Sequence, residues 1–244
     1  MRLGFSSETL DAFAENASRG SSRNFEAYAN HMQRILIQGT IDTLYMVFFA
    51  AISAIILGTL VGLFLYITAA NSVRPMPILN RFVGTIVNIG RSIPFVVLII
   101  LVFPLSVHIV GTSIGRTAAI VPLTIAAIPF LSRIIEATLH ELGSGIIEAA
   151  TSAGATTSQI IFRVILPESA PGLVASFTIL IINLITFSAM AGAVGSGGLG
   201  QLANTYGLQR HRMDVLVCTV IILVIIVQIV QGVGQFLSRK LDKR

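Results

Sequence analysis

Charged residues are scarce in this sequence. Only 11% of its 244 residues are Asp, Glu, Lys or Arg, whereas 54% are hydrophobic, and a soluble globular domain has about 25% charged residues. This scarcity excludes an ordinary soluble domain and predicts a polytopic membrane protein. The single cysteine, Cys218, lies in an apolar run and excludes an internal disulfide framework.

Motifs for catalysis or nucleotide binding are also missing. No G-x-x-x-x-G-K-[ST] sequence occurs, so the chain cannot bind ATP through a P-loop. The segment Gly195–Gly200 matches G-x-G-x-x-G, but it follows an apolar run instead of a strand, and it is better explained as a tight turn. The four histidines have no metal-ligand spacing. We therefore expect no enzymatic activity, cofactor or metal site in this chain.

The net charge of +5 does not indicate nucleic-acid binding, because the basic residues are scattered between apolar segments. A bilayer core about 30 Å thick needs roughly 20 apolar helical residues. Five windows of that kind predict transmembrane helices at about residues 43–68, 83–107, 115–136, 169–191 and 214–237. The expected fold is an all-α membrane domain over residues 35–240, with a polar segment at 142–168.

Two glycines predict where membrane helices pack closely, and two arginines lie at the ends of a predicted span. Gly58 and Gly62 have the spacing that permits close packing of two membrane helices. Arg116 and Arg133 lie at the ends of the third window, where their side chains are expected to snorkel to the membrane surface.

The N-terminal extension, residues 1–34, differs from the rest because it mixes charges with serine. Apolar residues at helical spacing from Phe25 to Leu36 predict a helix at the membrane interface. For residues 1–22 the alternative is a disordered tail.

Five spans place the two termini on opposite sides of the membrane. Lysine and arginine are enriched in cytoplasmic segments. A cytoplasmic C-terminus puts more of them inside: Arg74, Arg81, Arg91, Arg133, Arg163 and the basic residues from Arg239 to Arg244. We therefore expect an outside N-terminus, a cytoplasmic C-terminus and a cytoplasmic 142–168 segment.

That polar segment contains residues that typically start and end helices, and they predict two short helices. The first, Ile146 to Ala153, is expected to end at Gly154 in a left-handed cap. Thr156 and Gln159 have capping-box spacing and predict a second helix from Thr157 to about Ile165, which Leu166-Pro167 should stop. Together they form a projecting elbow. The alternative is a re-entrant or interfacial hairpin that only joins two spans.

The same segment resembles the EAA loop of permease subunits of bacterial ATP-binding-cassette (ABC) importers. In that family the loop forms coupling helices that dock on a separate cytoplasmic ATPase. The resemblance assigns ATPase coupling to Glu148, Ala149, Ala150, Gly154, Arg163, Leu166 and Pro167. More narrowly, Asn88–Phe95, Ile120–Phe130 and Ser188–Gly200 resemble the methionine-importer permeases.

The fourth predicted span carries a polar face. Asn183, Thr186 and Met190 are related by helical steps of three and four, with Phe187 beside them. Because lipid offers polar side chains no partners, this face is expected to meet a central substrate path. Ordinary polar packing between helices is the alternative.

What the resemblance implies is a type I importer-like permease in the bacterial inner membrane, with methionine as the expected substrate. The implied partners are a second copy of the chain, a dimer of ABC ATPase subunits carrying ATP and Mg²⁺, an extracytoplasmic substrate-binding protein and membrane lipid.

Two alternatives to this function stay open. The chain could be a permease for another amino acid or small solute, or belong to a different class as a secondary transporter or channel. A secondary transporter more often has an acid deep in a span. The charge-free windows of the second, fourth and fifth spans have none, which favours an external energy source.

Overall fold

The computed structural model describes residues 7–70 and 72–242, and the regular elements in them are helical. The expected all-α fold is confirmed. In chain order the elements are α1 (Ser7–Thr68), α2 (Pro77–Ser92), α3 (Phe95–Val110), α4 (Arg116–His140), α5 (Ser144–Ser152), α6 (Thr157–Gln159), the π-helix η1 (Ile160–Ile165), α7 (Leu166–Glu168), α8 (Ala170–Ala193), α9 (Gly198–Leu202), the π-helix η2 (Ala203–Gln209) and α10 (Met213–Leu241).

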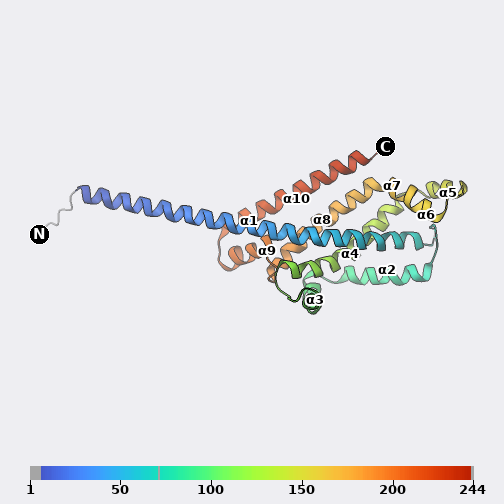
Figure 1. Ribbon diagram of the computed structural model, residues 1–244, viewed down its shortest axis with the longest axis horizontal. Helices are drawn as coiled ribbons and strands as arrows, with labels where there is room; N and C mark the ends of the chain where they lie inside the picture. The colour runs from blue at the N-terminus through green and yellow to red at the C-terminus, as the bar shows by residue number, and fades with distance from the viewer. Residues whose placement is uncertain (1–6, 71, 243–244) are drawn as a thin grey trace.

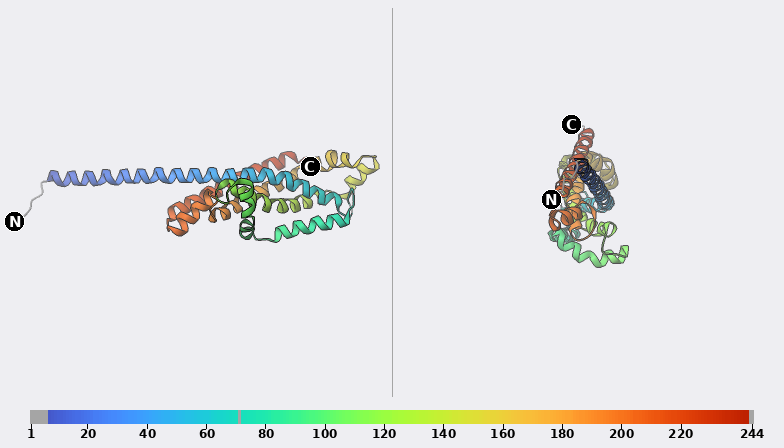
Figure 2. Two further views of the ribbon diagram at one scale, coloured as in Figure 1. Left: turned by 60° about the horizontal axis from the view of Figure 1, so that its bottom comes forward. Right: turned by 90° about the vertical axis from the view of Figure 1, so that its left-hand side faces the viewer.

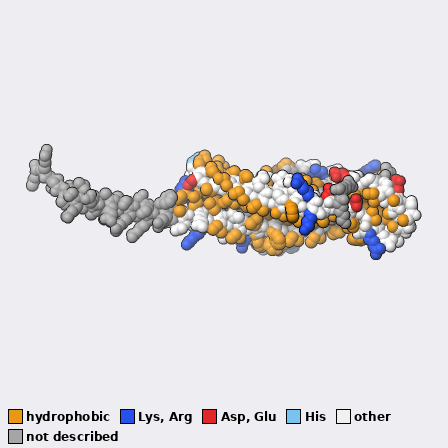
Figure 3. Space-filling model, turned by 90° about the horizontal axis from the view of Figure 1, so that it is seen from above, with side chains coloured by type: hydrophobic (Ala, Val, Ile, Leu, Met, Phe, Trp, Pro, Cys, Tyr) orange, Lys and Arg blue, Asp and Glu red, His pale blue; other side chains and the backbone are white. Residues whose placement is uncertain are grey.

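The long helices form an elongated bundle with two distinct ends. The start of α1 projects well beyond the bundle at one end, and α5 and α6 lie at the other (Figure 1). We call these the distal end and the elbow end, and we call residues 142–168 the elbow. A second view shows the same separation (Figure 2). Hydrophobic side chains cover much of the bundle, and acidic and basic side chains gather mainly toward the elbow end (Figure 3).

Four helical segments are long and apolar enough to cross a membrane: Ala27–Thr68 of α1, and α4, α8 and α10. The windows predicted at 43–68, 115–136, 169–191 and 214–237 overlap these four. Helices α2 and α3 pass the same test only as a pair, giving up to five crossings.

The second window, 83–107, does not form one straight helix. The chain breaks between α2 and α3 and turns by 107°. Pro94 has no N–H to donate and disfavours a helical conformation at the residue before it. Ile93 is accordingly extended, with φ −81° and ψ 121°.

The N-terminal extension is helical from Ser7 onward and continues into the first span without interruption. It is therefore not a helix separate from the first span. Its sequence contains no proline, so nothing breaks the helix before the bundle. The first six residues lie outside the described part of the chain.

Glycines bring α1 and α4 into close contact, as their spacing predicts. A Cβ added to Gly58 would lie 3.0 Å from Leu131 Cβ, and one added to Gly62 would lie 2.7 Å from the carbonyl oxygen of Ser132. The Ser132 hydroxyl also donates a hydrogen bond to the Gly58 carbonyl at 3.2 Å. These contacts join the two helices at the core of the bundle.

Arg133 does not snorkel at the end of a span. Helix α4 continues to His140, and the Arg133 guanidinium reaches sideways to α2. It donates to Asn88 Oδ1 at 3.1 Å and to the Gly84 carbonyl at 2.9 Å, and it pairs with Glu136 at 2.6 Å. Arg133 thus fastens α2 to α4.

The expectation that Arg91 belongs to the inner loop charges is wrong. A Cβ on the neighbouring Gly90 would lie 3.1 Å from the Pro129 ring. Pro129 is near the middle of α4, so Arg91 lies far from either end of the bundle.

We expect Gly62→Val to destabilise the bundle by about 1–3 kcal/mol, because the added atoms collide with the α4 backbone. The measurement is the thermal denaturation of the protein purified in detergent. Gly232→Val is the matched control, since nothing lies within 4 Å of a Cβ at Gly232. Equal denaturation midpoints for the two variants would contradict this account of the α1–α4 contact.

Candidate functional site

The first helix of the elbow ends as its sequence predicts. Gly154 has φ +78°, the left-handed region that favours glycine. The Ala155 N–H donates to the Ala150 carbonyl at 3.1 Å, and the Gly154 N–H donates to the Thr151 carbonyl at 2.9 Å. This pair of bonds is the Schellman motif, which satisfies the last carbonyls of a helix. The turn between the two helices is therefore defined by hydrogen bonds.

The second helix begins with the predicted capping box. Thr156 Oγ1 accepts from the Gln159 N–H at 3.4 Å, and Gln159 Oε1 accepts from the Thr156 N–H at 2.8 Å. The helical path then continues as η1 and α7 and reaches α8 after Ser169 alone. The expectation that Leu166-Pro167 stops the helix is wrong.

The reason is the position of Pro167. It lies in the first turn of α7, where proline is tolerated, and the wider π-helical turns precede it. The Leu166 N–H, for example, bonds to the Ile161 carbonyl, five residues back. The elbow is consequently joined to α8 by a nearly continuous helical path.

The elbow has an inner apolar face and an outer exposed face. Ile160 and Ile165 are buried in the core of the bundle. Of the residues expected to couple to an ATPase, Ala150 and Leu166 are partly buried and pack inward. The others are exposed on the outside: Glu148, Ala149, Gly154, Arg163 and Pro167. The inner face holds the elbow in place, and the outer face is accessible.

One exposed residue of the elbow is absent from the predicted set. The Phe162 side chain is 66% exposed, next to Arg163. The sequence could have indicated its exposure, because Phe162 does not lie on the helix face that holds the buried Ile160 and Ile165. An aromatic ring on an exposed surface is typical of a contact with another protein.

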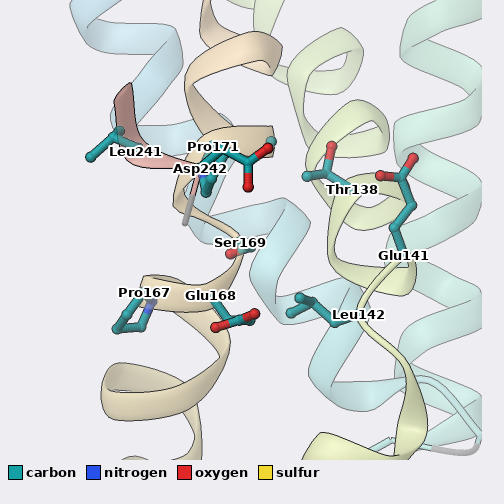
Figure 4. Close-up of a pocket in the computed structure, with 10 residues that line it drawn as sticks. Thr138, Glu141, Leu142, Pro167, Glu168, Ser169, Pro171, Leu241 and Asp242 are labelled. Atoms are coloured by element: carbon teal, nitrogen blue, oxygen red, sulfur yellow. The ribbon is translucent and has the colours of Figure 1, made fainter. Parts of the chain in front are cut away.

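The elbow also borders the ends of two spanning helices besides α8. A cavity of about 360 Å³ separates its last residues from the ends of α4 and α10. Figure 4 shows Pro167, Glu168 and Ser169 on one side and Thr138, Glu141 and Leu142 across from them, with Leu241 and Asp242 nearby. No cluster of His, Cys, Asp and Glu among the described residues could hold a metal ion.

The face predicted to line a path lies along α8, apart from the elbow. Thr186 and Met190 are exposed, whereas Asn183 and Phe187 are partly buried. Asn183 Oδ1 is buried without a hydrogen-bond partner among the described residues. Thr186 and Met190 therefore share an open side of α8, as their spacing predicts.

Phe187 is part of an aromatic cluster with Phe95 and Phe130. Only Phe187 is among the predicted path residues. Its ring stacks on Phe95 at a centroid distance of 4.5 Å and an interplanar angle of 3°. Beside this pair lies a cavity of about 160 Å³, which Arg91 and Phe130 also line. The sequence feature that could have indicated this cluster is Arg91, a charged residue directly before the apolar run that starts at Ser92.

Known proteins resemble this chain in sequence. Residues 54–244 match the family model described as binding-protein-dependent transport system inner membrane component. The probable D-methionine transport system permease protein MetI of Vibrio cholerae is 47% identical, over 86% of this chain and 93% of that relative. The methionine import system permease protein MetP of Bacillus subtilis is 43% identical, over 74% of this chain and 81% of its own.

Solved structures resemble it in fold. One chain from the inward-facing conformations of the MetNI methionine ABC transporter superposes with a TM-score of 0.85 at 43% identity, covering 87% of this chain and 98% of its own. A chain of an amino acid ABC transporter with histidines has a TM-score of 0.73 at 19% identity, covering 88% and 98%. The second match shows the fold alone.

We expect Thr156→Ala to loosen the start of the second elbow helix. Loss of an N-cap side chain costs about 1 kcal/mol, which corresponds to about fivefold faster exchange of the Gln159 amide. Hydrogen exchange read by mass spectrometry over residues 153–165 measures it. Thr157→Ala is the control, because Thr157 follows the cap and is exposed. Unchanged exchange in Thr156→Ala would mean that the capping box does not hold the helix.

Proposed function

The chain belongs to the family of binding-protein-dependent transport system inner membrane components, and we propose that it is a methionine importer permease driven by a separate ATPase. Family membership makes the chain a membrane permease and not an enzyme. The proposal concerns its cargo, its partners and its orientation in the membrane.

Methionine as cargo is supported by the names of the relatives. Two of them, from Vibrio cholerae and Bacillus subtilis, are named as methionine permeases and are more than 40% identical to this chain. The similar solved structure at 43% identity is also a methionine transporter. Agreement among these names favours methionine over another amino acid or small solute.

An ATPase partner is supported by the outer face of the elbow. The sequence has no P-loop, so energy from ATP must be delivered by another subunit that binds ATP and Mg²⁺. The elbow is a compact projection fixed at its base by Ile160 and Ile165, and it presents Glu148, Gly154, Phe162 and Arg163 outward. We assign this face to the ATPase, which places the elbow and the C-terminus in the cytoplasm.

The distal end then faces the outside, where an extracytoplasmic binding protein delivers substrate. A single copy leaves the Thr186 and Met190 side of α8 open. A homodimer would cover this side and enclose a path between the two copies. Because the elbow continues through η1 and α7 into α8, ATP-driven movement of the two elbows would rock α8 and open the path alternately to each side.

We expect Gly154→Val to uncouple the complex. A β-branched residue in the left-handed region is strained by about 1–2 kcal/mol, so the Schellman turn and the angle of the elbow should change. Substrate-stimulated ATP hydrolysis should fall at least severalfold in the assembled complex, while membrane insertion is retained. Gly145→Ala is the control, because a Cβ there meets nothing within 4 Å. Normal stimulation in Gly154→Val would remove the elbow's assigned role.

Co-purification and uptake test the function as a whole. The chain extracted from membranes should bring an ATPase subunit with it, and uptake of labelled L-methionine should require ATP and be competed by D-methionine. If no ATPase accompanies the chain, the importer proposal fails in favour of a channel or secondary transporter. If labelled L-methionine is not taken up in an ATP-dependent way, the cargo is a different solute.

A further inference from the structure

Arg91 occupies an unusual depth for a charged residue. The neighbouring Gly90 packs on Pro129, near the middle of α4, and α4 is one of the helices able to span a membrane. An arginine at the centre of a bilayer costs about 2.5–3.5 kcal/mol on insertion scales, and such residues face protein or a water-filled cavity. The Arg91 side chain is exposed in the single chain, so it must meet something other than lipid.

Arg91 has no counter-ion among the described residues. The ion pairs that these residues form do not include its side chain. Arg133, also on the α2–α4 contact, is by contrast satisfied by Glu136, Asn88 and Gly84. Arg91 is therefore a charge held in the membrane region that no described residue of the chain neutralises.

An aromatic cavity opens beside this charge. It has a volume of about 160 Å³ and receives side chains from four helices. Phe95 of α3 and Phe187 of α8 stack to form one wall, and Phe130 of α4 contributes another. The 107° turn between α2 and α3 brings Phe95 to this place, directly after the chain leaves α2. Arg91 lines the same cavity.

The dimensions and chemistry of the cavity restrict what fits. An apolar protein cavity of about 150 Å³ holds a benzene molecule, so this one has room for a single side chain of similar size. A thioether makes favourable contacts with aromatic rings, at about 5 Å from sulfur to ring. A guanidinium binds a carboxylate through two parallel hydrogen bonds. Together the cavity and the guanidinium suit an amino acid with an apolar side chain, including one with a thioether.

We propose that Arg91 and the cavity formed with Phe95, Phe130 and Phe187 are an amino-acid binding site inside the membrane domain. Arg91 holds the α-carboxylate of the substrate, and the aromatic cavity takes its side chain. This inference rests on the proposed function and adds to it a place where the permease itself selects its cargo. Met190 lies farther along α8, toward the distal end, on the exposed side that it shares with Thr186.

The test is equilibrium binding of labelled L-methionine to the purified permease–ATPase complex without the binding protein, with the ATPase subunit alone as the blank. Methioninol, which lacks the carboxylate, is the competing probe. The wild-type complex should prefer methionine to methioninol at least tenfold. Arg91→Gln should bind the two ligands alike, and Arg91→Lys, which keeps the charge but loses the planar fork, should be intermediate.

Arg74→Gln is the matched control, since it removes an exposed arginine outside the cavity and should keep the full preference. A folded Arg91→Gln complex that still prefers methionine tenfold would overturn the site while leaving the proposed function standing. A wild-type complex that neither binds nor transports methionine would overturn both.

A second variant, Phe130→Ala, tests the aromatic part of the site separately. It also tests the proposal if the Arg91→Gln complex fails to assemble. Phe130→Ala enlarges the cavity, so binding of methionine should weaken at least fivefold while binding of the bulkier L-phenylalanine is retained or strengthened. Parallel loss for both amino acids, or no change for either, would show that the cavity does not receive the side chain.

Discussion

The three hydrogen bonds made by the Arg133 guanidinium are the interaction on which the rest of the membrane domain depends. Two of them cross from α4 to Asn88 and Gly84 on α2, and the third goes to Glu136 of α4, which neutralises the charge. Without water as an alternative partner, polar groups in a bilayer must be satisfied by protein. This requirement fixes α2 against α4, and α4 is itself fixed against α1 by Gly58 and Gly62.

The position of α2 in turn determines the site around Arg91. Once α2 is fastened, the break at Pro94 directs α3 across the bundle, and Phe95 meets Phe187 of α8. The two arginines at the contact between α2 and α4 therefore differ. Arg133 is hydrogen-bonded to Asn88, Gly84 and Glu136, whereas Arg91 lines the cavity and is available to bind a ligand. In the proposed mechanism α8 connects both parts of the protein, because its aromatic and polar residues follow the elbow on one nearly continuous helical path.

Most of the fold could be predicted from the sequence because the bilayer imposes simple rules. Charge-free windows marked the positions of four spanning helices, and Gly154 and the Thr156–Gln159 pair marked the ends of the elbow helices, since these signals are local. The errors arose where tertiary contacts override local rules. Arg133 does not snorkel because α2 supplies partners for it, and Pro167 fails to stop a helix because a π-helical segment precedes it. The depth of Arg91 follows from packing of Gly90 on Pro129, which no local pattern encodes.

Cross-linking of the elbow tests the central claim, that this projection couples the permease to an ATPase, most directly. Cys218 is the only cysteine, so Cys218→Ser provides a background for single cysteines. We would place one at exposed Ser152 in α5 and another at Ile114, 68% exposed at the distal end, and treat the co-expressed complex with a short thiol-to-amine reagent. The account predicts a product with the ATPase from Ser152→Cys only. A product from Ile114→Cys, or none from Ser152→Cys in an intact complex, would contradict it.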